Sequence, residues 1–198
     1  MNLLLIAEIA EGLRLPPFGT EFEKHMEAKR NPTVYAASST AWRLLELALQ
    51  RAGVSEIPQV RFEEKGKPVF ADSPLHFSLS HSGRLAAALL SDSPCAVDVE
   101  AVKSAVRDDL ILRCLNGREL ELGCDFFECW TRKECLGKLS GEGLPSRLNQ
   151  MDSLNPIYTD HFHLQRFTDA AGQEYALSAL CMNCSELHIQ KIEPEELY

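Results

Sequence analysis

Residues 95–100 read Cys-Ala-Val-Asp-Val-Glu, and this alternation constrains the fold more than any other stretch of the chain. Two valines alternate with Asp98 and Glu100, which is the period-two pattern of a strand with one buried face. The alternation puts Asp98 and Glu100 on the same face of that strand, with both side chains pointing the same way. The sequence therefore predicts a sheet that carries two neighbouring carboxylates on one surface.

A predicted helix at 125–140 supplies a third carboxylate. Trp130, Glu134 and Lys138 are spaced four residues apart and should stack along one helix face. Three carboxylates that converge from a strand and a helix suit a hard cation such as Mg²⁺, and a neighbouring lysine can hold a phosphate on the same metal. Taken singly, each half has a simpler interpretation: a solvent-facing Asp-x-Glu on a strand, and an ordinary helical ion pair.

Two further tracts precede these, Gly66-Lys67-Pro68 and His76-Phe-Ser-Leu-Ser-His-Ser-Gly83. The four tracts, in this order and at this spacing, resemble the 4′-phosphopantetheinyl transferases, specifically the larger single-chain (Sfp-type) class. That family reads Gly-Lys-Pro, Phe-x-x-Ser-His-Ser, Gly-Ile-Asp-x-Glu and Trp-x-x-Lys-Glu-x-x-x-Lys. Each tract is weak alone, but the four in register are a strong signal, and the resemblance runs over essentially the whole chain.

The resemblance implies an α+β fold in which two pseudo-symmetric α/β halves pack about a central cleft. Residues 1–93 would form the half that binds coenzyme A, and residues 94–198 the half with the metal and the catalytic site, in one compact unit. Periodicity indicates strands near 2–10, 61–63, 76–82, 85–91, 95–100, 161–168, 174–182 and 187–192. It indicates helices near 20–30, 34–52, 103–115, 117–122 and 125–140, with a loop at 141–155.

The implied reaction moves 4′-phosphopantetheine from coenzyme A to a serine of an apo acyl or peptidyl carrier protein and releases 3′,5′-adenosine bisphosphate. By resemblance, Mg²⁺ would be held by Asp98, Glu100 and Glu134. Glu134 would accept the serine proton, directly or through a metal-bound water, with Glu119 as the alternative base. Lys133 and Lys138 would add positive charge beside the phosphates.

The implied contacts to coenzyme A come from the earlier tracts: Lys67, Pro68, Ser80, His81 and Ser82. The chain departs from the family at two places. No basic residue occurs in 34–42, where the family carries an arginine directed at the nucleotide phosphates, although Lys29 and Arg30 are possible substitutes. Ala96 stands where glycine is usual. Two rival functions stay open: an Mg²⁺-dependent phosphate or nucleotide hydrolase, and a carrier-binding homologue without catalytic activity.

A net charge of −9 over 198 residues argues against nucleic acid or an anionic membrane as the partner. Positive charge nevertheless gathers in sequence around the expected site, and Arg107, Arg113 and Arg118 are predicted to meet an acidic carrier. The apolar residues 1–10 are interrupted by Glu8 and are too short to span a bilayer, so we expect a cytoplasmic monomer. Seven cysteines, with one Cys-x-x-Cys at 181–184, indicate thiols of a reducing compartment.

Overall fold

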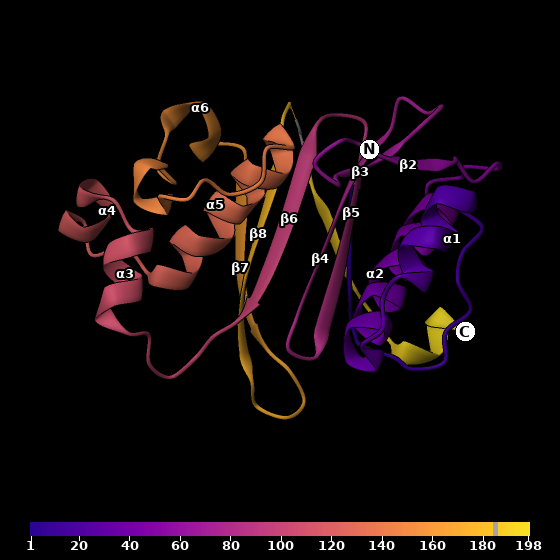
Figure 1. The fold of residues 1–198 in the computed structure, drawn as a ribbon, viewed down its shortest axis with the longest axis horizontal. Helices are drawn as coiled ribbons and strands as arrows, with labels where there is room; N and C mark the ends of the chain where they lie inside the picture. The colour runs from indigo at the N-terminus through magenta and orange to yellow at the C-terminus, as the bar shows by residue number, and fades with distance from the viewer. Residues whose placement is uncertain (184–185) are drawn as a thin grey trace.

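The computed structural model describes residues 1–183 and 186–198 and confirms the mixed α+β class (Figure 1). Cys184, the end of the Cys-x-x-Cys tract, lies outside the described residues. The strands are β1 (Asn2–Glu8), β2 (Val60–Phe62), β3 (Pro68–Phe70), β4 (His76–Ser82), β5 (Leu85–Ser91), β6 (Cys95–Ala101), β7 (Phe162–Thr168), β8 (Glu174–Cys181) and β9 (His188–Ile192). The helices are α1 (Thr20–Glu27), α2 (Pro32–Arg51), α3 (Asp108–Cys114), α4 (Gly117–Glu121), α5 (Phe126–Ser140) and α6 (Pro156–Thr159), with 3₁₀ turns at Leu148–Gln150 and Pro194–Leu197.

The first sheet has the strand order β4-β5-β1-β9 and is covered on one face by α1 and α2 (Figure 1). The N-terminus of helix α2 is capped, because the Asn31 side chain accepts hydrogen bonds from two backbone N–H groups and Pro32 occupies the first turn. The core between helix and sheet is aromatic. Trp42 packs against Phe18 and Phe22, with ring centroids 5.4 and 4.9 Å away.

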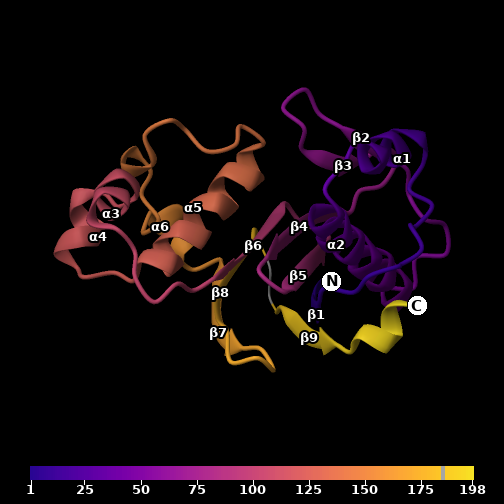
Figure 2. The ribbon, with the colours of Figure 1, turned by 60° about the horizontal axis from the view of Figure 1, so that its bottom comes forward.

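The second sheet, of order β6-β8-β7, packs against the other face of the first. Leu4 and Ile6 of β1 share a buried cluster with Val97 and Val99 of β6. Since side chains alternate across a strand, Asp98 and the residues in step with it face the opposite way, toward α5. The layers are therefore helices, sheet, sheet and helix, and α5 with α3, α4 and α6 lies on the opposite side of the two sheets from α2 (Figures 1 and 2).

The two sheets meet where β4 and β6, each the edge strand of its own sheet, lie side by side (Figure 1). Hydroxyl groups from alternate residues of β4 accept hydrogen bonds from alternate N–H groups of β6. The pairs are Val97 N to Ser78 Oγ (3.0 Å), Val99 N to Ser80 Oγ (3.2 Å) and Ala101 N to Ser82 Oγ (3.1 Å). These bonds satisfy edge amides that would otherwise be buried without acceptors.

The chain crosses back once between the two layers. The expected division at residues 93–94 falls in the connection from β5 to β6, but β9 returns from the far end of the sequence and pairs in parallel with β1. The first sheet therefore contains a strand from residues 94–198. None of the helices in 1–183 and 186–198 combines the length and apolar character needed to cross a membrane.

Candidate active site

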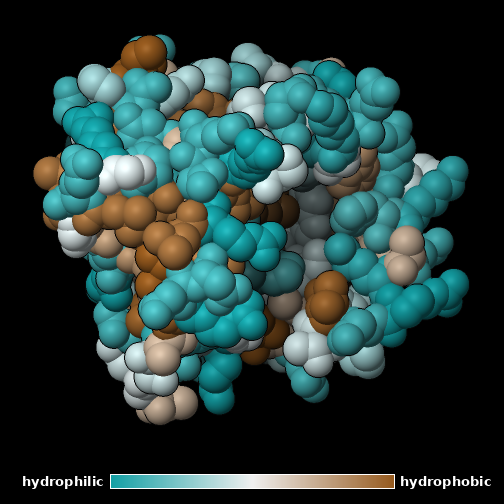
Figure 3. All heavy atoms as spheres, turned by 60° about the vertical axis from the view of Figure 1, so that its left-hand side comes forward, coloured by the Kyte–Doolittle hydropathy of each residue, from teal (hydrophilic) through white to brown (hydrophobic). Residues whose placement is uncertain are grey.

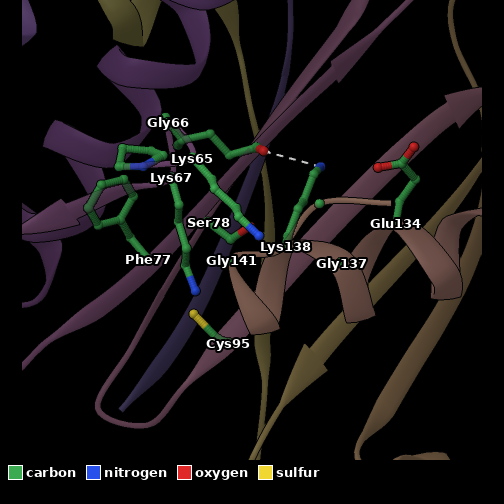
Figure 4. Close-up of a pocket in the computed structure, with 13 residues that line it drawn as sticks. Lys65, Gly66, Lys67, Phe77, Ser78, Cys95, Glu134, Gly137, Lys138 and Gly141 are labelled. Atoms are coloured by element: carbon green, nitrogen blue, oxygen red, sulfur yellow. Dashed lines mark hydrogen bonds between the residues drawn. The ribbon is translucent and has the colours of Figure 1, made fainter. Parts of the chain in front are cut away.

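A cleft of about 410 Å³ opens at the junction of the sheets, between α2, β4, β6 and α5. It brings together residues from all four sequence tracts: Gly66, Pro68, Ser80, His81, Asp98, Glu100, Trp130, Glu134 and Lys138. A smaller cavity of about 260 Å³ continues from it and is drawn in Figure 4. Both cavities are lined by Glu134 and Lys138, so they form one continuous hollow along the C-terminal half of α5.

The carboxylates of β6 and α5 influence one another electrostatically. Burial and the negative charge of Asp98 together raise the pKa of Glu100, and a hydrogen bond from Ser82 partly opposes the shift. Burial and then Asp98 also raise the pKa of Glu134. The charge of Asp98 therefore makes ionisation of both Glu100 and Glu134 harder, which is the arrangement that a bound cation relieves.

Asp98 is the most buried of the three, with 6% of its surface exposed. Its Oδ1 atom accepts two hydrogen bonds, from Ser80 Oγ at 2.9 Å and from Lys138 Nζ at 2.7 Å. Its Oδ2 atom is buried and has no hydrogen-bond partner within the described part of the chain. A buried carboxylate oxygen without a donor is costly unless a ligand pairs with it.

The described residues contain no group of three or more His, Cys, Asp or Glu side chains close enough to hold a metal ion as they stand. Lys138 instead supplies the positive charge beside Asp98. The donor set nevertheless fits a hard divalent cation, because it offers carboxylate oxygens alone, one of them unpartnered. Asp98, Glu100 and Glu134 are the residues that could hold it.

Lys138 lies at the centre of the hollow (Figure 4). Besides Asp98, its ammonium group donates to Leu79 O at 3.3 Å and to Val97 O at 2.8 Å, so it joins β4 and β6 at the cleft. Its side chain keeps 29% of its surface exposed and can reach an anion in the cavity. Glu134 lines the same cavity, as the four-residue spacing predicts.

The Gly66-Lys67-Pro68 tract forms the turn between β2 and β3. Gly66 has a φ of 85°, a conformation that favours glycine, and its N–H bonds to Glu63 O. Lys67 Nζ donates to Leu139 O at 2.8 Å, near the end of α5. The lysine thereby ties the turn to the second layer and leaves Gly66 and Pro68 lining the main cleft.

The serine-histidine tract is divided between two tasks. Ser80 and Ser82 turn their hydroxyls toward β6, so these two predicted coenzyme A contacts are engaged in holding the sheets together. His81 lines the cleft, and burial, Lys138 and Lys29 lower its pKa. The sequence therefore predicts that this tract lies at the cleft, but it does not predict the direction in which the serine hydroxyls point.

A second imidazole, that of His25, lines the cleft and was not predicted from the sequence. His25 of α1 stacks on Phe62 of β2, with ring centroids 4.4 Å apart, and both line the cavity with Trp42. Burial and then Lys29 lower the pKa of His25. No motif marks this residue, because it reaches the cleft only through the packing of α1 against β2.

Glu119 and Lys133 are not brought to the cleft. Lys133 Nζ donates to Glu119 Oε2 at 2.6 Å and to Cys114 O at 2.5 Å, and the two side chains are 1% and 0% exposed. Burial would raise the pKa of Glu119, but hydrogen bonds from Lys133, Ser153 and Asn116 outweigh it and the pKa is lowered. The predicted roles of Glu119 as alternative base and Lys133 as phosphate ligand therefore find no support in the geometry.

The chain is similar in sequence to several named proteins. The chain is 34% identical over 132 residues to 4′-phosphopantetheinyl transferase AcpT of Salmonella typhi, covering 59% of this chain and 66% of the relative. It is 32% identical over 151 residues to 4′-phosphopantetheinyl transferase psf-1 of Bacillus pumilus, covering 66% of this chain and 61% of the relative. This chain is a relative of the 4′-phosphopantetheinyl transferases.

The similarity spans just under two thirds of the length of these curated relatives. The chain is also 36% identical over 80 residues to the uncharacterized protein YieE of Escherichia coli. A comparison with models of protein families finds no match.

The buried pair of Glu119 and Lys133 yields a test of stability. Lys133→Met should lower the free energy of unfolding by about 3–5 kcal/mol, because it leaves the Glu119 carboxylate buried without its ion partner. Glu119→Gln combined with Lys133→Met should recover part of this loss, which urea denaturation of the single and double variants would measure.

The stability that the Glu119–Lys133 pair contributes should decrease at low pH. Since folding lowers the pKa of Glu119, its stabilising contribution is present above the unfolded value of about 4.3 and is lost as the pH falls through the folded value. A Lys133→Met variant as stable as the wild type at pH 7 would contradict a structural ion pair.

Proposed function

We propose that this protein is a 4′-phosphopantetheinyl transferase of the larger single-chain class, which modifies a serine of an apo acyl or peptidyl carrier protein with Mg²⁺ and coenzyme A. One observation carries the proposal: a single cleft at the junction of the sheets is lined by residues of all four tracts that characterise the family. The names of the relatives support the same reaction.

The side chains of the cleft divide the chemistry among them. Asp98, Glu100 and Glu134 would hold Mg²⁺, which neutralises charge on phosphate oxygens when bound. Lys138 lies beside Asp98 and lines both cavities, so its ammonium group can meet the diphosphate of coenzyme A.

The transfer step makes one bond and breaks one bond. The hydroxyl oxygen of the carrier serine attacks the phosphorus next to pantetheine, and the bridging P–O bond of the diphosphate breaks. The bond's electron pair leaves with 3′,5′-adenosine bisphosphate. Glu134 accepts the serine proton, because it is a carboxylate that lines the same cavity as Lys138 and carries no other hydrogen-bonding task among the described contacts.

The nucleotide end of coenzyme A would lie beside two imidazoles of the cleft. His25 and His81 both line the cleft, and the charge of Lys29 acts on both. Trp42 and Phe62 offer aromatic surface beside them. These residues would take the place of the arginine that is missing from 34–42.

The carrier would reach the carboxylates along a second groove of about 310 Å³. Figure 3 shows apolar side chains gathered beside a hollow on the face formed by α3 to α6. The groove shares Glu100 and Trp130 with the cleft and adds Leu110 and Phe126 as apolar surface, with Lys103 and Arg107 as cations. An apolar floor with a basic rim suits the acidic surface expected of a carrier.

Two of the three arginines predicted for this face do not line the groove. Arg118 donates to Asp152 at 3.3 Å, which neutralises part of its charge. Arg113 lines a separate hollow with Arg147. Arg107 does line the groove, so the basic rim consists of Lys103 and Arg107.

The deciding experiment is intact-mass analysis of several apo carrier proteins after incubation with coenzyme A and Mg²⁺. We expect one carrier to gain the mass of phosphopantetheine. Turnover of coenzyme A without an acceptor would favour the hydrolase alternative, and carrier binding without turnover would favour a non-catalytic homologue.

Substitution of the proposed base should separate activity from stability. Glu134→Gln should lower kcat by about 10²–10⁴, the range typical of a lost general base. Its melting temperature without Mg²⁺ should not fall, because burial and Asp98 already disfavour the ionised form of Glu134. Glu128→Gln, on the first turn of α5 and not among the residues that line the cleft, serves as the control. Near wild-type turnover by Glu134→Gln would rule out this role.

Recognition of the 3′-phosphate should be weak and pH-dependent. Dephospho-coenzyme A should be used within about tenfold of coenzyme A, equivalent to ~1.4 kcal/mol, at pH 8. The preference for coenzyme A should grow as the pH falls, because His25 and His81 have lowered pKa values and gain charge only below the ordinary range near 6.5. Ratios of kcat/KM from pH 6 to 8 would measure this, and a strong preference at pH 8 would contradict it.

Charge reversal should locate the carrier. The Lys103→Glu, Arg107→Glu variant should raise the carrier KM several-fold while the KM for coenzyme A stays constant, because rim charges act mainly on association. Arg118→Glu, at an arginine that does not line the groove, is the matched control and should have a smaller effect. Added salt should narrow the difference, since such charges are screened beyond about 8 Å at physiological ionic strength. Equal carrier kinetics in all three proteins would place the carrier elsewhere.

A further inference from the structure

The three serines of β4 look equivalent in the sequence, but Ser80 is the one whose hydroxyl donates to Asp98, whereas Ser82 bonds to Glu100. Like Ser78 and Ser82, it accepts a hydrogen bond from a β6 amide, that of Val99 at 3.2 Å. Ser80 also donates, and its acceptor is Asp98 Oδ1 at 2.9 Å. Ser78 is as deeply buried and accepts from Val97 N at 3.0 Å, but among the described residues it donates to no carboxylate.

The chemistry of a hydroxyl makes this contact directional. A serine has one O–H donor and two acceptor lone pairs. Because the Val99 N–H occupies one lone pair, the oxygen is held at the edge of β6 and its single proton is committed to Asp98. Ser80 therefore links the junction of the two sheets directly to the carboxylate site.

The two oxygens of Asp98 are consequently in different states. Oδ1 receives Ser80 from β4 and Lys138 from α5, at 2.9 and 2.7 Å. Oδ2 is buried with no hydrogen-bond partner among the residues that the structure describes. A carboxylate fastened through one oxygen cannot turn freely, so the other oxygen keeps a defined position.

We propose that Ser80 is a positioning residue that fastens Asp98 through Oδ1 and thereby presents Oδ2 as the oxygen available to a divalent cation. The proposal rests on the proposed function for its catalytic readout but not for its binding readout. Without the hydroxyl, the Asp98 carboxylate would be held by Lys138 alone, and Lys138 is also needed for the phosphates. Partners that orient a ligand in this way typically change metal affinity by about 10–100-fold.

Ser80→Ala and Ser78→Ala form a matched pair that separates positioning from packing. Each removes one buried hydroxyl and leaves one β6 amide without its acceptor, so both should lower the melting temperature. Only Ser80→Ala should raise the dissociation constant for Mn²⁺, measured by electron paramagnetic resonance on the protein alone, by about 10-fold or more. Ser78→Ala should keep the wild-type value.

The catalytic readout is the Mg²⁺ concentration for half-maximal carrier modification, which should shift in Ser80→Ala and not in Ser78→Ala. Ser80→Thr retains the hydroxyl and should bind Mn²⁺ with an affinity close to that of the wild type. If Ser80→Ala does not fold, Ser80→Cys replaces it, because a thiol is a weak donor.

Equal Mn²⁺ affinity in Ser78→Ala and in Ser80→Ala, or in the Ser80→Cys variant that replaces it, would overturn the proposal. A wild-type protein that binds Mn²⁺ but modifies no carrier would overturn the proposed function instead, and the comparison of Mn²⁺ affinities would still decide the role of Ser80.

Discussion

The rest of the structure depends on how the free edge of β6 is satisfied. A strand buried at the edge of a sheet needs acceptors for its outward amides, and here serine hydroxyls from β4 provide them. Side chains reach farther than main-chain carbonyls, so the two strands need not merge into one continuous sheet. The sheets stay distinct and stack, and the carboxylates of β6 face α5 at the mouth of the junction.

This arrangement explains why the cleft is electrostatically unfavourable without a ligand. Asp98 raises the pKa of both neighbouring carboxyl groups, and one of its own oxygens has no donor in the described part of the chain. A protein that used this junction only for stability would do better with apolar residues there. Unfavourable electrostatic interactions among neighbouring carboxylates are characteristic of sites that bind a charged ligand.

Much of this was predictable where one physical rule acts alone. The hairpin of β4 and β5 and the alternation in β6 follow from period-two patterns, and the predicted bounds of 76–82 and 85–91 match the structure. The main-chain position of Ser80 was also predictable, but its partner was not, because periodicity says which residues share a face and not what that face meets. Helix α6 begins directly after the predicted loop at 141–155 and was not predicted, although Asn155 before Pro156 is a capping signal. Strand β9 lies beside β1 only because the chain crosses back, which no local pattern encodes.

Helix α5 carries two lysine–carboxylate pairs, and their difference separates structure from function. Lys133 and Lys138 are five residues apart, which turns their side chains roughly 140° from each other on a helix of 3.6 residues per turn. Lys133 points into the protein, where Glu119 is saturated by three donors and almost no surface is exposed. Lys138 points to the cleft, where Asp98 keeps an oxygen without a donor and the ammonium group stays partly exposed. The four-residue spacing puts Lys138, and not Lys133, on the helix face of Glu134, and the direction of that face decides which lysine a ligand can reach.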